Sequence, residues 1–126
     1  MMMMYNNVKI NEVLEKIDED TKAKVQKYLD GKKTQSIKMF NEGDRLIVEA
    51  FIAERKEEVC LPYLEIDKNA LIMDLHCQCC DDEESCVHKL ALLSAAQVML
   101  ETGDYDYHMA LKRKTAQVLE KILFKH

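Results

Sequence analysis

Apolar residues recur at helical spacing near both ends of the chain. Close to the N-terminus, apolar positions at i, i+3, i+4 and i+7 predict a helix over about residues 8–17. Asp18 and Asp20 are both suited to cap a second helix, which should end before Gly31, so the N-terminal helices occupy about residues 8–30. The same spacing predicts a C-terminal helix over about residues 107–125.

Between residues 34 and 77 the pattern becomes rich in β-branched and aromatic residues, which is typical of strands. Short polar turns separate these segments, so they predict about four strands joined as an antiparallel meander. Pro62 lacks a backbone N–H and therefore predicts an edge or a bulge in the third strand. An alanine- and leucine-rich helix is expected from about Leu90 onward. The expected fold class is α+β, with helices before and after the meander.

Length and charge restrict the partners that this chain can have. Its 126 residues fit a single domain spanning residues 1–126, and its net charge of −5 argues against a generally basic nucleic-acid-binding protein. Contact with DNA would have to come from a local patch, although the same lysines could simply be the solvated faces of helices. The candidate contacts are Lys22, Lys24, Lys27, Lys32, Lys33, Lys38, Lys112, Arg113 and Lys114.

The sequence also predicts a cytoplasmic protein that does not enter the membrane. No signal peptide is recognisable at the N-terminus, and the longest apolar-rich segment, residues 90–100, is too short to cross a bilayer. Five cysteines are an odd number, and four of them fall within ten positions, which is poor material for disulfides in a reducing compartment. This crowding indicates a metal site.

Four potential metal ligands occur as two close pairs. Cys77 and Cys79 form a C-x-C pair at a predicted strand end, and Cys86 and His88 form a C-x-H pair six residues later. With Ser85 as the N-cap, the second pair would lie in the first turn of the following helix, where the helix dipole favours a thiolate. Three thiolates and an imidazole suit a tetrahedral, closed and therefore structural Zn²⁺ site.

Some of the neighbouring residues leave alternatives open. Cys80 could replace Cys79, because Cys77 and Cys80 would form the C-x-x-C pairing of other zinc sites. His76 could be a further ligand or a strand residue on the opposite face from Cys77, and the second is expected. Cys60 lies in a different predicted strand and is expected to pack in the core.

The C-x-C and C-x-H pairs, followed by the helical segment Lys89-Leu90-Ala91-Leu92-Leu93, resemble the SWIM zinc finger. The similar region covers about residues 70–100. More loosely, the upstream strands resemble the N-terminal region of bacterial Swi/Snf-type helicases. The resemblance implies a ββα-like finger with zinc held by Cys77, Cys79, Cys86 and His88.

The same resemblance implies a non-catalytic accessory module that binds DNA, as the N-terminal part of a Swi/Snf-type helicase or as its companion. The chain has no P-loop, and a closed zinc site offers no position for a substrate, so neither enzymatic activity nor a small-molecule substrate is expected. The alternative is a protein–protein interaction adaptor, whose partner could be a helicase motor domain. It would use the four acids of residues 81–84, which would repel a phosphate backbone.

Overall fold

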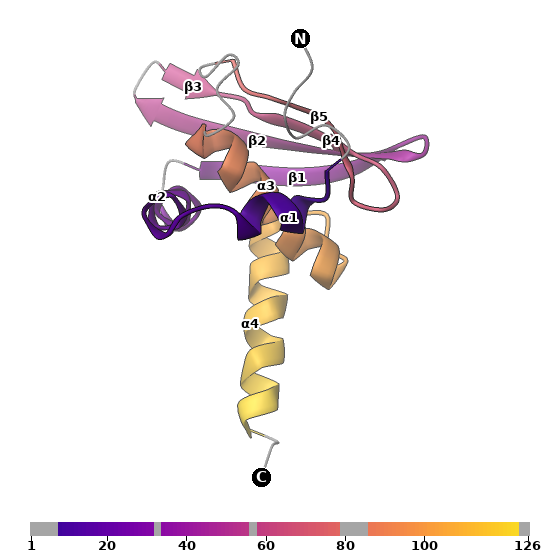
Figure 1. The fold of residues 1–126 in the computed structure, drawn as a ribbon. Helices are drawn as coiled ribbons and strands as arrows, with labels where there is room; N and C mark the ends of the chain where they lie inside the picture. Colours follow the sequence, from indigo (N-terminus) through magenta and orange to yellow (C-terminus); the bar gives the residue numbers. More distant parts are fainter. Residues whose placement is uncertain (1–7, 32–33, 56–57, 79–85, 124–126) are drawn as a thin grey trace.

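The computed structural model describes residues 8–31, 34–55, 58–78 and 86–123. These residues form an α+β fold with a five-stranded antiparallel sheet and four helices, as Figure 1 shows. The elements are α1 (Ile10–Glu15), α2 (Glu19–Asp30), β1 (Thr34–Glu42), β2 (Arg45–Arg55), β3 (Glu58–Cys60), β4 (Tyr63–Ile66), β5 (Ile72–His76), α3 (Val87–Thr102) and α4 (Tyr107–Leu123).

The sheet follows the predicted meander but has one strand more than expected. Its order is β1-β2-β4-β5, and the short strand β3 also pairs with β2, beyond the end of β4. The third predicted strand is thus divided into β3 and β4 by Leu61 and Pro62. Proline cannot donate to a strand ladder, so pairing is interrupted there and resumes after it. The predicted number of strands was therefore too low, and the division places Cys60 at the end of β3.

The first two helices begin and end close to the predicted residues. In α2, the carboxylate of Asp18 accepts a hydrogen bond of 2.7 Å from the backbone N–H of Thr21, which is the expected N-cap interaction. Helix α1 is shorter than predicted, because the chain turns after Glu15 to reach this cap. A backbone hydrogen bond from Ile72 to the carbonyl of Val8 joins the start of the chain to β5.

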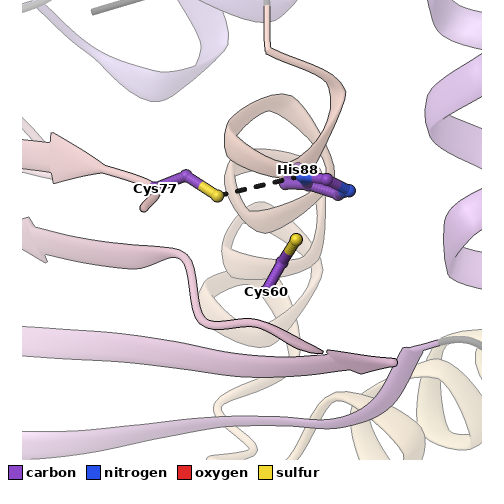
Figure 2. Close-up of side chains that lie close together, drawn as sticks. All are labelled: Cys60, Cys77 and His88. Atoms are coloured by element: carbon purple, nitrogen blue, oxygen red, sulfur yellow. Dashed lines mark hydrogen bonds between the residues drawn. The ribbon is translucent and has the colours of Figure 1, made fainter. Parts of the chain in front are cut away.

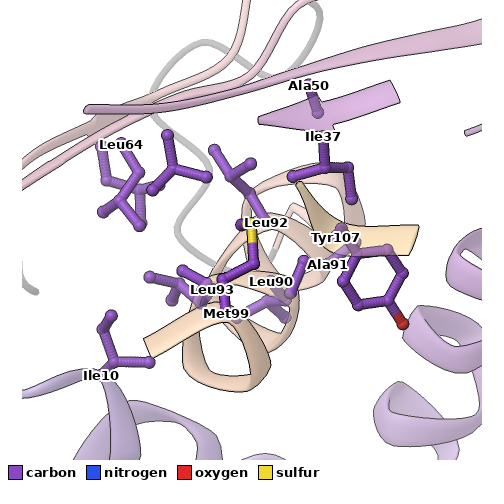
Figure 3. Close-up of a cluster of buried hydrophobic side chains, with 14 of the residues drawn as sticks. Ile10, Ile37, Ala50, Leu64, Leu90, Ala91, Leu92, Leu93, Met99 and Tyr107 are labelled. Atoms are coloured by element: carbon purple, nitrogen blue, oxygen red, sulfur yellow. The ribbon is translucent and has the colours of Figure 1, made fainter. Parts of the chain in front are cut away.

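Helix α3 lies at the centre of the molecule. It contacts each of the other three helices and strands β1, β2 and β4. A helix surrounded in this way must be apolar on every side, and α3 meets the condition through residues such as Leu92 and Met99, which are almost completely buried. Figure 3 shows this cluster between the sheet and the helices.

Helix α4 extends away from the rest of the molecule (Figure 1). Its first turn is anchored, since Tyr107 and Ala110 are buried, and Arg113 forms a 2.6 Å ion pair with Asp104. From Leu111 to Leu123 every residue is exposed. No helix among the described residues is long and apolar enough to span a membrane.

Candidate metal centre

Three residues of the predicted zinc motif, Cys77, Cys86 and His88, lie close together among the buried residues. Cys77 follows directly after the last residue of β5, and its side chain is only 2 % exposed. His88 lies in the first turn of α3 and is 7 % exposed. Although they belong to elements that are separate in the sequence, these two side chains face one another (Figure 2).

One ring nitrogen of His88 faces two sulfur atoms. Its Nδ1 atom lies 3.8 Å from Sγ of Cys77 and also 3.8 Å from Sγ of Cys86. In a tetrahedral zinc site with ordinary bond lengths, a sulfur and a nitrogen ligand are separated by about 3.6 Å. The two distances therefore match those between ligands of a common ion. They place the Nδ1 atom of His88 beside both sulfur atoms.

Cys86 occupies the N-cap of α3, one residue later than the predicted cap. The expectation that Ser85 caps the helix and that Cys86 lies inside its first turn was wrong by this one residue. Cys86 makes no side-chain cap hydrogen bond, and it is buried at 4 % exposure. At the N-cap its sulfur lies beside the positive end of the helix dipole.

Cys86 is disulfide-bonded in this structure, contrary to the expectation that the cysteines are poor material for disulfides, whereas Cys60 and Cys77 are not disulfide-bonded. A metal is bound by thiolates, so Cys86 can act as a ligand only in its reduced form. Metal binding at this centre therefore requires reducing conditions.

Cys60 is the residue of this centre that sequence reasoning missed. It was expected to pack in the core, and it is indeed 1 % exposed and part of the core cluster. In addition, the ligand atoms of Cys60, Cys77 and His88 all lie within 4.8 Å of one another, so this group could hold a metal ion. No sequence signal marks Cys60, because sixteen residues and two strands separate it from Cys77.

A further side chain, that of Tyr28, contacts the imidazole of His88. The ring of Tyr28, from α2, meets the imidazole edge-on, with ring centroids 5.1 Å apart and an interplanar angle of 88°. Such a contact holds the imidazole in one orientation.

The remaining predicted ligands divide into two groups. Cys79, the alternative ligand Cys80 and the acids of residues 81–84 lie outside the described residues. His76 is exposed, stacks on Tyr63 with centroids 4.9 Å apart and approaches Asp74 at 3.9 Å. It faces away from the metal centre, as expected for its position in the strand.

The candidate DNA contacts do not form one patch of uncompensated charge. Lys22 pairs with Glu19 and Lys114 with Glu101, and Arg113 pairs with Asp104 as described above. Lys32 and Lys33 lie outside the described residues. The candidates that are exposed and without an ion pair to another described residue are Lys24, Lys27, Lys38 and Lys112, on α2, β1 and α4.

Comparison with known proteins identifies no relative of this chain. No protein-family model matches the chain, and neither curated proteins nor solved structures give a match. The resemblance to a SWIM finger consequently rests on the spacing of the cysteine and histidine pairs and on the helix that follows them.

Proposed function

We propose that the protein is a non-catalytic accessory module whose fold is held together by a structural Zn²⁺ ion. The observation that carries this proposal is the position of Nδ1 of His88, which lies 3.8 Å from the sulfur atoms of both Cys77 and Cys86. Sulfur and imidazole ligands in tetrahedral arrangement favour zinc over magnesium or calcium, which prefer oxygen.

A structural role follows from burial. The described donors are all nearly inaccessible to water, and a site in which protein fills all four positions leaves none for a substrate. The ion would connect the end of the sheet to the central helix. Loss of the ion should therefore disturb the whole core rather than a surface loop.

Metal analysis of the reduced protein tests this part of the proposal. We expect one zinc ion per chain, and we expect chelation to reduce helical circular dichroism and the melting temperature. Retention of both signals in a chelator, or the absence of zinc after purification under reducing conditions, would contradict the structural role.

For the wider role we propose association with DNA, through the exposed lysines that form no ion pair with another described residue. Phosphate contacts release counterions, so binding should weaken steeply with salt. Fluorescence anisotropy with short duplex and single-stranded DNA measures this. The double variant Lys24→Gln/Lys27→Gln should reduce the logarithmic salt slope by about two.

A control is Lys68→Gln, which removes one lysine charge from the exposed turn between β4 and β5. It should leave the affinity unchanged. If the wild-type chain shows no binding at low ionic strength, direct DNA binding is ruled out, and if Lys68→Gln lowers the salt slope by half as much as the double variant, these lysines are not the contacts.

The alternative role is that of a protein-interaction adaptor, such as one that joins a helicase motor domain. One observation favours it over DNA binding: α4 exposes a stripe of large apolar side chains, which is unusual unless another surface covers it. The stripe comprises Leu111, Val118, Leu119, Ile122 and Leu123. Such an adaptor would also use the four acids of residues 81–84. Reversing their charge should therefore weaken capture of the partner without altering zinc content.

A further inference from the structure

We propose that Cys60 is a ligand of the metal ion, and that the coordinating set is Cys60, Cys77, Cys86 and His88. This proposal rests on the zinc site proposed above and changes its membership: the third sulfur comes from β3 instead of from Cys79. The ion would then join three elements that are distant in the sequence, namely β3, the end of β5 and the start of α3.

The geometry of the thiol supports this assignment. Sγ of Cys60 lies within 4.8 Å of both Sγ of Cys77 and the nearest ring nitrogen of His88. Two sulfur ligands of one zinc ion are separated by about 3.8 Å, so a displacement of about one ångström brings Cys60 to ligand distance. Figure 2 shows its sulfur directed towards the other two side chains.

The backbone holds Cys60 in this position. Cys60 pairs with Ile52 of β2, and Pro62 interrupts the ladder just beyond it. Its side chain lies on the buried side of the sheet, where it belongs to the core cluster together with Ile52. Since β2 pairs with β1, β3 and β4, this pairing leaves the thiol little freedom to turn elsewhere.

The assignment also supplies the number of ligands that a tetrahedral zinc ion needs. Cys60, Cys77, Cys86 and His88 supply three sulfurs and one nitrogen, all from residues that are at most 7 % exposed. A tetrahedral zinc ion accepts four protein ligands. With these four in place, neither Cys79 nor Cys80 is needed.

The decisive experiment leaves Cys60 untouched. In the double variant Cys79→Ser/Cys80→Ser the only cysteines of the chain are Cys60, Cys77 and Cys86. The reduced full-length variant is loaded with Co²⁺, whose thiolate charge-transfer absorption reports the number of sulfur ligands. We expect one Co²⁺ per chain and a three-thiolate spectrum equal to that of the wild type, which requires all three remaining cysteines.

Adding Cys60→Ser to this background should reduce the charge-transfer absorption by about one third and weaken Co²⁺ binding at least about tenfold. If the double variant instead loses metal or shows a two-thiolate spectrum, Cys79 or Cys80 is the ligand and the proposal for Cys60 is wrong. The zinc site itself would still stand in that case. If the reduced wild type binds no metal, the proposed function fails as well.

Discussion

Sγ of Cys77 and Nδ1 of His88 lie 3.8 Å apart, although one residue follows a strand and the other begins the central helix. Both are buried, and both belong to a group whose ligand atoms lie within metal-binding distance. An ion at this point would connect the sheet to the helix around which the whole core is built.

Replacing His88 therefore tests how far the fold depends on the metal. Structural zinc contributes about 10 kcal/mol or more in zinc-finger peptides, which is comparable to the entire stability of a domain. We expect His88→Ala to abolish zinc binding and to remove the cooperative thermal transition, measured by circular dichroism. The contact with Tyr28 would be lost as well, but aromatic contacts contribute only about 1 kcal/mol.

The matched control is His76→Ala. This histidine is near the same strand end, but its side chain is 55 % exposed and lies apart from the metal centre. Its removal should change the free energy of unfolding by less than about 1 kcal/mol and leave zinc content at one per chain. Equal effects of the two substitutions would contradict the assignment of His88 as a ligand.

Because of the buried phenol of Tyr107, we expect the free energy of unfolding to depend on pH in the alkaline range. Burial, and next the negative charge of Asp30, raise the pKa of this phenol above its usual value of 10.0. A raised pKa means that the folded state favours the neutral phenol. The stabilisation is complete below pH 10 and is lost as the pH rises through the folded pKa, with a limiting slope of about 1.4 kcal/mol per pH unit.

Tyr107→Phe should therefore flatten the alkaline decline in stability, measured by urea denaturation between pH 9 and about pH 11. The decline should become smaller without vanishing, because burial also raises the pKa of Tyr63, which the variant keeps. If Tyr107→Phe left the alkaline slope unchanged, the pKa of the Tyr107 phenol would not differ between the folded and unfolded states.

The exposed side chains of α4 should contribute little to the free energy of unfolding. Ile122 is 59 % exposed, whereas Met99 on α3 is completely buried. We expect Ile122→Gln to alter the free energy of unfolding by no more than about 0.5 kcal/mol, and Met99→Ala to lower it by about 2–5 kcal/mol.

Urea denaturation in the presence of zinc, repeated at several protein concentrations, checks this contrast. A large loss of stability in Ile122→Gln that grows with protein concentration would mean that the apolar stripe of α4 is covered by a second copy of the chain. A large loss that is independent of concentration would contradict its exposure.

Much of the architecture follows from local patterns. The carboxylate of Asp18 caps α2, and helical periodicity marks α4, because capping and amphipathicity depend on residues within a few positions of one another. The division of a strand at Pro62 is also a local effect, although the sequence alone could not decide between an edge and a bulge.

The metal centre contains some residues that the sequence marks as ligands and others that only the fold brings there. The close pairs around Cys77 and His88 are visible in the sequence, because ligands only a few residues apart leave a recognisable spacing. Cys60 and Tyr28 leave no such signal. They reach the centre through the pairing of β3 with β2 and through the packing of α2 on α3, contacts between segments far apart in the chain.

The sequence by itself thus determined the class of fold and most of the chemistry of this protein: helices around an antiparallel sheet, and thiols and an imidazole at metal-ligand spacing. Only the tertiary structure decided that a third thiol, from β3, lies beside them, that Nδ1 is the nitrogen facing the sulfurs, and that the apolar face of α4 remains exposed. The physical reason is that spacing records neighbours along the chain. Burial and ligand geometry depend on which distant segments the fold brings together.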